Sequence, residues 1–214
     1  MFDENISGEL PEHIEFIHKT KKVFEEWGYT VLILHSDCTY MDCFNTVIKK
    51  SRVPDRIGKK YGFPLAGRCA INSRCKIKPI KNFYKKLSED YICYVGLAVD
   101  EKQRINRMKT KKNNISLLEK YGYTEKMAYQ LCKKYDLLSP VYSYTKRGGC
   151  WFCMNCSINQ LRNLRNNHRQ LWEKLLNLEF CPCAAAPIWN ILRNKSIHDY
   201  DNFFEMEDRQ IKLL

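Results

Sequence analysis

The stretch TVLILH, from Thr30 to His35, decides how the rest of the chain is interpreted. It is a short apolar run rich in residues that favour strands, which is typical of a strand buried on both faces of a sheet. Before it, apolar residues recur at helical spacing and predict a helix from about Pro11 to Trp27, with Gly28 in the position of a helix C-cap. A helix followed by a buried strand is the repeating unit of a parallel α/β sheet.

The same alternation continues along the chain. Residues 36–74 are irregular and predict a long functional loop that contains one short helix near 41–50. A helix is expected over residues 77–87, and a second buried strand, YICYVGLAV, over Tyr91–Val99.

Two further helix starts are marked by their caps. Thr124 stands where an N-cap is expected, and Ser157 with Gln160 fits a capping box before a helix that continues to Leu178. We therefore expect an α/β fold in which a parallel sheet is flanked by helices. In such sheets, ligands bind at the C-terminal ends of the strands.

The composition excludes several classes of protein. The chain has 214 residues, of which 44% are hydrophobic and 28% charged, as is typical of a soluble globular protein. No apolar run approaches the roughly 20 residues that span a bilayer, and the first residues lack the pattern of a signal peptide. We expect a cytoplasmic protein with no membrane partner. The net charge of +12 favours polyanionic partners, although Lys-rich loops also serve solubility alone.

The chain contains eleven cysteines, and in a reducing compartment clustered cysteines bind metal or react more often than they form disulfides. The loop GGCWFCMNC places Cys150, Cys153 and Cys156 at intervals of three, so their thiolates can converge on one metal centre. Zinc takes four such ligands and a [4Fe–4S] cluster takes one thiolate per iron, so a fourth ligand must come from elsewhere. Unligated thiols are the alternative. The cysteines interpreted as core or loop residues are Cys38, Cys43, Cys93 and Cys132.

Five stretches, taken in chain order, match motifs that occur together in one family. They are MFDENISGELPEH, with Asp3 and Glu9-Leu10-Pro11-Glu12; GRCAINSRCKIKPI, with Arg68, Cys69, Lys76 and Pro79; VGLAVDEKQRI, with Gly96, Asp100, Glu101 and Arg104; YGYTEKMAYQLCKKYDL; and GGCWFCMNC. Together they resemble the phosphoadenosine phosphosulfate reductase-like members of the PP-loop, or adenine-nucleotide α-hydrolase-like, superfamily. The likeness covers roughly residues 1–178 and leaves residues 179–214 as a helical, cysteine-rich C-terminal extension.

The resemblance has consequences for the metal centre and for the nucleotide. It implies that the loop of Cys69 and the cysteine loop share one end of the sheet, which makes Cys69 the expected fourth ligand. Cys75 is the reserve ligand, and Cys181 or Cys183 are further alternatives. The family's Ser-Gly-Gly-Lys-Asp-Ser phosphate loop does not occur here, so we expect either an N-terminally incomplete version or a natural variant that lost nucleotide hydrolysis. The reductase's Glu-Cys-Gly-Leu-His motif is absent too, so reduction of phosphoadenosine phosphosulfate itself is not expected.

Charged residues in the matching stretches are the candidates for chemistry. Asp100 and Glu101 follow a predicted strand and can hold Mg²⁺, orient a hydroxyl or pair with Arg104, and a purely structural ion pair is the alternative. Glu9 and Glu12 equally suit the first turn of a helix. The candidates for binding the cofactor are Asp3, Glu9, Arg68, Lys76 and Lys78.

Two functions of different classes remain. The first is an enzyme domain that acts on an adenylated or sulfur-bearing substrate by sulfur transfer or nucleotidyl activation, beside a cysteine-bound [4Fe–4S] cluster or, alternatively, zinc. Its small-molecule partner is an adenine nucleotide or sulfonucleotide, and ATP enters only if the missing phosphate loop is supplied. The second is a catalytically inactive basic module that recognises nucleic acid, such as tRNA or DNA, or a partner protein. A homodimer is compatible with either.

Overall fold

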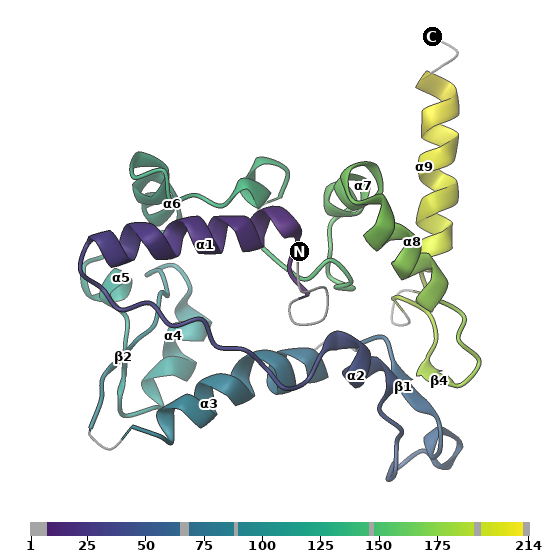
Figure 1. Ribbon diagram of the computed structural model, residues 1–214, viewed down its shortest axis with the longest axis horizontal. Coiled ribbons are helices and arrows are strands. Elements are labelled where there is room, and N and C mark those ends of the chain that lie inside the picture. Colours follow the sequence, from purple (N-terminus) through teal and green to yellow (C-terminus); the bar gives the residue numbers. More distant parts are fainter. Residues whose placement is uncertain (1–7, 65–68, 88–89, 146–147, 191–193, 212–214) are drawn as a thin grey trace. The chain divides into compact units, whose positions relative to one another are not determined.

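The computed structural model describes residues 8–64, 69–87, 90–145, 148–190 and 194–211 (Figure 1). The chain divides into two compact units, one formed by Met1–Lys81 with Val141–Leu214 and the other by Asn82–Pro140. We call them unit 1 and unit 2 and describe each by itself. Each combines helices with short parallel strands, which confirms the expected mixed α/β class. Within the described residues, no helix has both the length and the apolar character that crossing a bilayer requires.

Unit 1 contains most of the helices. The first ends as the sequence predicts, because Gly28 follows it with a φ of 85° and donates its amide to the Glu25 carbonyl. Its helices are α1 (Pro11–Glu26), α2 (Tyr40–Asn45), the 3₁₀ turn η1 (Pro54–Arg56), the π-helical segment η2 (Asn72–Ile77), then α7 (Ile158–Asn167), α8 (Arg169–Leu178) and α9 (Ile197–Ile211). The segment η2 continues into α3 (Lys78–Tyr84), which crosses from unit 1 into unit 2 after Lys81. A further 3₁₀ turn, η3 (Pro140–Ser143), stands at the border of the two units.

The sheet of unit 1 has two parallel strands, β1 (Lys60–Gly62) and β4 (Ala184–Ala186), which come from opposite ends of the chain. Lys60 pairs with Ala184 and Gly62 with Ala186. Gly62 has a φ of 77°, and a Cβ atom there would lie 2.3 Å from the Ala186 carbonyl oxygen. Only glycine therefore allows the strands to approach this closely.

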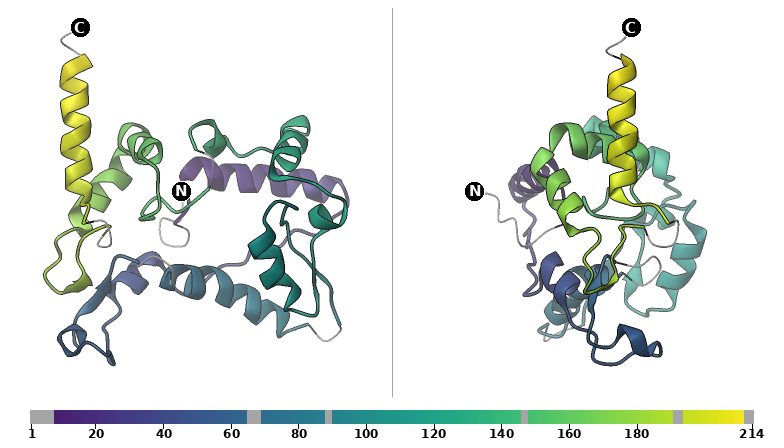
Figure 2. Two further views of the ribbon diagram at one scale, coloured as in Figure 1. Left: turned by 180° about the vertical axis from the view of Figure 1, so that it is seen from behind. Right: turned by 90° about the vertical axis from the view of Figure 1, so that its right-hand side faces the viewer.

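The core of unit 1 is built from both parts of the chain. Phe152, Trp172, Trp189 and Phe204 are almost completely buried. Two of them, Trp189 and Phe204, come from residues 179–214, the segment expected as a C-terminal extension. The capping box of Ser157 and Gln160 opens α7 as predicted, but the helix stops at Asn167 and α8 starts after His168. Figure 2 shows α7 and α8 as two separate rods, with α9 following.

Unit 2 is smaller. Its strands β2 (Cys93–Tyr94) and β3 (Asn114–Ile115) are parallel, and its buried apolar cluster consists of Leu97, Ile105 and Met108. Thr124 caps the last helix as the sequence predicts, by accepting a hydrogen bond from the Met127 amide at 3.2 Å. The helices of unit 2 are α4 (Lys102–Lys109), α5 (Leu117–Lys120) and α6 (Glu125–Lys134).

Both predicted strands need correction. Residues 30–35 form no strand, and Leu32 and Leu34 are exposed. A strand needs a partner, and no described segment pairs with this one; the Val31 carbonyl instead accepts a hydrogen bond from the Lys21 ammonium at 2.9 Å. Of residues 91–99 only Cys93 and Tyr94 pair as a strand, and Tyr94 is 62% exposed rather than buried. The described residues therefore form two separate two-stranded sheets in place of one larger one.

Candidate functional site: a cysteine-rich region in unit 1

Helix α2 brings two thiols together. Thr39 is its N-cap, and Asp42 completes a capping box: the Thr39 amide donates to the Asp42 carboxylate at 2.8 Å, and the Asp42 amide donates to the Thr39 hydroxyl at 3.1 Å. In such a box, the residue before the cap commonly packs against the fourth residue of the helix. Cys38 and Cys43 occupy these two positions, and their Sγ atoms lie 3.5 Å apart.

A third thiol comes from the π-helical segment. Cys75 lies within η2, and its Sγ is 3.8 Å from that of Cys43. Single-turn π-helical segments within helices are frequent at functional sites. Among the described Cys, His, Asp and Glu side chains, Cys38, Cys43 and Cys75 form one group of potential metal ligands, with all their sulfur atoms within 4.8 Å of one another. We call this group the Cys38–Cys43–Cys75 cluster.

Two polar contacts hold the parts of this cluster together. The Arg74 guanidinium donates to the Thr46 hydroxyl at 3.0 Å, and the Ser36 hydroxyl donates to the Arg74 carbonyl at 3.4 Å. Burial raises the pKa of Cys43 and also that of Cys75, where the charge of Arg74 opposes the effect. Both side chains are therefore neutral thiols at pH 7.

The cysteines predicted from the sequence lie in a different arrangement. The loop turns twice, since the Cys153 amide donates to the Cys150 carbonyl at 3.0 Å and the Cys156 amide donates to the Cys153 carbonyl at 2.9 Å. The Cys156 thiol faces the Cys150 carbonyl at 3.6 Å. Together with Cys69, these described residues form no group of three sulfur atoms within 4.8 Å. A four-cysteine centre here stays a prediction and requires the loop to rearrange.

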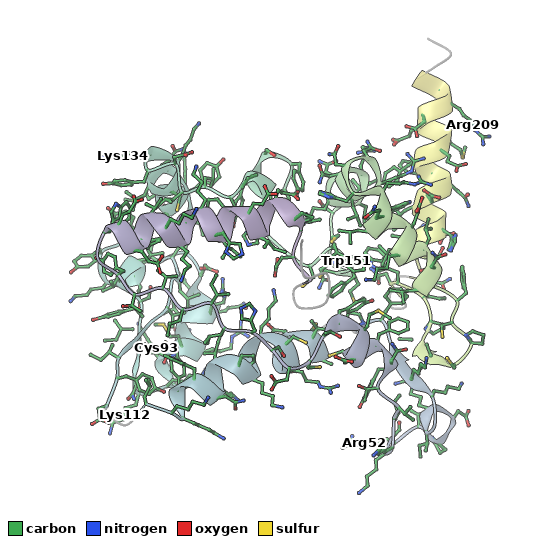
Figure 3. All side chains as sticks on the ribbon, viewed as in Figure 1. Arg52, Cys93, Lys112, Lys134, Trp151 and Arg209 are labelled. Atoms are coloured by element: carbon green, nitrogen blue, oxygen red, sulfur yellow. The ribbon has the colours of Figure 1, made fainter. Side chains whose placement is uncertain are left out.

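Segments far apart in the sequence nevertheless meet at this loop. The Trp151 amide donates to the Gly8 carbonyl at 2.8 Å, and a Cβ atom on Gly8 would lie 2.5 Å from the Phe152 ring. Figure 3 labels Trp151, the residue that follows Cys150. The Lys76 ammonium forms an ion pair with the Glu9 carboxylate. The structure thus brings the N-terminal segment against the cysteine loop.

Charges around Lys76 link three of the predicted site residues. Burial opposes the charged form of Lys76, but its interactions with Cys150 and Glu9 outweigh burial and raise the pKa of Lys76 above its ordinary value. Burial also raises the pKa of Cys150 to about 12, although Lys76 opposes this. Cys150 is therefore a thiol rather than a thiolate at neutral pH.

Tyr40 stands beside this cysteine-rich region. Its ring stacks on Phe152 with 3.6 Å between ring centroids, and its side chain is 8% exposed. Among the described residues its hydroxyl has no hydrogen-bond partner. Burial raises the pKa of Tyr40, and the neighbouring Cys150, Cys43 and Cys69 add to the effect, so the phenol is neutral.

A pocket of about 380 Å³ adjoins the cluster. Cys43 lines it, its walls include the apolar and aromatic side chains of Ile48, Tyr61 and Phe63, and two cations, Lys50 and Arg56, contribute to its lining. This volume lies within the range of small-ligand sites. A pocket with apolar and aromatic walls and two cationic side chains suits a ligand that combines a flat ring with a negative charge.

The predicted catalytic residues lie in unit 2, where the carboxylates form an ion pair and hydrogen bonds with neighbouring groups of the protein. Glu101 forms an ion pair with Arg104 and accepts a hydrogen bond from the Ala98 amide at 3.1 Å. Asp100 accepts the Glu125 amide at 3.1 Å and so holds the start of α6. Such contacts fit the alternative role given above, a purely structural ion pair. The catalytic roles of Asp100, Glu101 and Arg104 therefore stay predictions.

The other predicted residues are scattered. Asp3 and Arg68 lie outside the described residues, and Lys78 is exposed on α3. The alternative ligands Cys181 and Cys183 approach each other with 2.9 Å between their sulfur atoms, and Cys183 is exposed.

The sequence predicts Cys38 and Cys43 as core or loop residues, and Cys75 only as the reserve ligand of the four-cysteine centre. The spacing Cys-x4-Cys, with an N-cap Thr between the two, was the available indication, because it matches a zinc-ligand spacing. Comparison of the chain with protein-family models, with curated proteins and with solved structures found no match.

Proposed function

We propose that this chain is a phosphoadenosine phosphosulfate reductase-like domain, of the adenine-nucleotide α-hydrolase-like fold, that acts on an adenylated or sulfur-bearing anion beside a cysteine-bound metal centre. The observation that carries the proposal is the pocket of about 380 Å³ in unit 1, which combines aromatic walls with two cations and adjoins clustered thiols. The ion pair of Glu9 and Lys76 beside Cys150 supports it, since these residues come from three of the five matching stretches.

Each part of the pocket has a chemical role in this proposal. Tyr61 and Phe63 offer aromatic surface for a nucleobase. Arg56 is suited to bidentate contact with phosphate or sulfate, and Lys50 supplies a point charge. The class of reaction that fits is sulfur transfer or nucleotidyl activation, with the thiols close to the reacting group.

Calorimetric titration with AMP and adenosine 5′-phosphosulfate tests the pocket. We expect saturable binding that Arg56→Gln and Lys50→Gln each weaken about tenfold, a loss of about 1.4 kcal/mol. Lys112→Gln, which changes an exposed cation of unit 2, is the control and should bind as the wild type does. Absence of saturable binding for both nucleotides, or an equal loss in the control, would refute the proposal.

One observation favours the second function, a basic module that binds nucleic acid. Helix α4 and the turn after it carry a dense run of cations, all exposed, in unit 2. They are Lys102, Arg104, Arg107, Lys109, Lys111 and Lys112, and Figure 3 labels the last of them. Such a run attracts phosphates without reading sequence.

Salt dependence separates this function from the first. Binding of tRNA or duplex DNA through these cations should weaken steeply as salt rises, with a slope that grows with the number of phosphates neutralised. Replacing Lys111 and Lys112 by Gln should reduce that slope by about 2, while the Arg56→Gln variant keeps it. A slope unchanged in the double variant would exclude this run as the nucleic-acid site.

A further inference from the structure

We propose that Cys38, Cys43 and Cys75 form a binding site for a thiolate-preferring cation, Zn²⁺, with an open fourth position. The site is separate from the four-cysteine centre expected at Cys69, Cys150, Cys153 and Cys156, and the inference does not depend on the proposed function.

The distances between the sulfur atoms fit such a cation. A tetrahedral Zn²⁺ with Zn–S bonds of about 2.3 Å separates its sulfur ligands by about 3.8 Å. The Cys43 and Cys75 sulfur atoms are 3.8 Å apart, and those of Cys38 and Cys43 are 3.5 Å apart. The Sγ atoms of the third pair, Cys38 and Cys75, lie within 4.8 Å of each other, so the binding of Zn²⁺ has to bring them closer by at most about 1 Å.

The scaffold holds these thiols before any metal arrives. Cys38 and Cys43 are set by the capping box of α2, and Cys75 by a π-helical segment inside a longer helix. The contact of Arg74 with Thr46 ties the two elements together at 3.0 Å. Ligands on such ordered elements lose less freedom on binding than ligands on mobile loops.

Apolar packing alone explains only part of this arrangement. Two cysteines before and within a helix can simply pack as a staple, because cysteine behaves as a small apolar residue. A staple needs two residues, whereas here a third thiol arrives from more than 30 residues away in sequence. Tyr40, which lies between Cys38 and Cys43 in sequence, also buries a hydroxyl without a partner among the described residues, and a buried polar group of this kind calls for an explanation.

The ligand count defines the kind of site. Among the described residues no fourth Cys, His, Asp or Glu completes the group. Three protein ligands with a position left for water or another small ligand is the arrangement of catalytic rather than structural zinc. On binding, the three S–H bonds break, three Zn–S bonds form and the protons pass to solvent. The resulting charge of −1 is partly offset by Arg74, whose charge acts on Cys75.

The test uses the full chain, stripped with a chelator and titrated with Co²⁺ and then with Zn²⁺. We expect thiolate-to-cobalt charge transfer and the visible bands of tetrahedral Co²⁺, both abolished by Zn²⁺. Cys38→Ser and Cys75→Ser should each weaken binding by more than the roughly 10–100-fold that loss of an outer-shell partner costs. Cys132→Ser in unit 2 is the matched control and should bind Co²⁺ as the wild type does. Cys153→Ser distinguishes this site from the predicted four-cysteine centre, because it removes a ligand of that centre only.

A second measurement, made on the wild type, tests the same site even if a variant fails to fold. In the wild type, Zn²⁺ should slow alkylation of Cys38, Cys43 and Cys75, followed by mass spectrometry, and leave Cys132 unchanged. The inference is overturned if Cys38→Ser and Cys75→Ser bind Co²⁺ as the wild type does, if only Cys153→Ser loses binding, or if Zn²⁺ protects none of the three thiols.

Discussion

At the scale of single residues, the hydroxyl of Tyr40 is an unusual group in unit 1. It is buried and has no hydrogen-bond partner among the described residues. Leaving such a group unsatisfied costs about 1–3 kcal/mol. Tyr40→Phe keeps the stacking on Phe152 and removes the hydroxyl, so we expect the free energy of unfolding in urea to rise by about 1 kcal/mol.

Tyr144→Phe is the matched comparison. The Tyr144 hydroxyl donates to the Glu12 carboxylate at 2.9 Å, so its removal leaves a partly buried acceptor with one partner fewer. We expect this variant to lose about 1–2 kcal/mol. If Tyr40→Phe loses as much as Tyr144→Phe, the Tyr40 hydroxyl has a partner in solution, such as a bound water or ligand.

Residue identity alone could not have predicted the Cys38–Cys43–Cys75 cluster. The spacing of Cys38 and Cys43 indicates a pair, because capping geometry is local. The third member depends on where the π-helical segment places Cys75, which is a long-range property. Conversely, Cys150, Cys153 and Cys156 are neighbours in sequence, yet the backbone turns between them do not gather their sulfur atoms.

At the scale of elements, the capping box of α2 is sensitive to acid. Hydrogen bonds from the Thr39 amide and hydroxyl lower the pKa of Asp42 below its ordinary value of 3.8. Because the pKa is lower in the folded state, this contribution to stability is present above pH 3.8 and is lost as the pH falls through the folded-state pKa. In the Asp42→Asn variant, the free energy of unfolding should therefore fall less steeply at acid pH than in the wild type. Asp37→Asn, at an exposed neighbouring position, should leave this pH dependence unchanged.

The start of α9 depends on one buried carboxylate. Glu179 is 7% exposed and accepts the amides of Trp189 at 2.7 Å and of Ile197 at 2.7 and 2.8 Å. Hydrogen bonds to a charged group contribute about 1.5–3 kcal/mol each. Glu179→Gln turns an amide NH₂ toward these donors, so we expect a loss of about 2–4 kcal/mol in chemical unfolding followed by Trp fluorescence.

The control for this prediction is Glu173→Gln on α8. Glu173 is exposed and pairs with Arg169 one turn away at 2.8 Å. Such pairs contribute about 0.3–0.5 kcal/mol. Equal effects of the two substitutions would show that Glu179 does not anchor α9.

The starts of α6 and α7 were predictable from the sequence because their caps, at Thr124 and Ser157, are local. Strands were not, because pairing decides whether an apolar run becomes one. TVLILH has the composition of a buried strand, but no described segment pairs with it. Ala184–Ala186, without any β-branched residue, forms a strand because Gly62 allows β1 to approach it.

At the scale of the whole molecule, the two units have cores of very different size. Unit 2 buries Leu97, Ile105 and Met108, whereas the core of unit 1 includes several aromatic residues and both ends of the described chain. The sequence did not predict this division, since unit 1 is assembled from segments on both sides of unit 2. Stability should differ accordingly, because the apolar area removed from water sets the main favourable term.

Hydrogen exchange followed by mass spectrometry measures this difference. We expect the amides of α4 and α6 to exchange through openings of lower free energy than those of α7 and α8. Ile105→Ala, at a buried position of unit 2, should speed exchange in unit 2 alone. Leu175→Ala, at a buried position of unit 1, should lower the free energy of unfolding of unit 1 by about 2–5 kcal/mol. If Ile105→Ala instead lowers protection equally in α7 and α8, the units unfold as one, and the pocket and thiols of unit 1 depend on unit 2 for their stability.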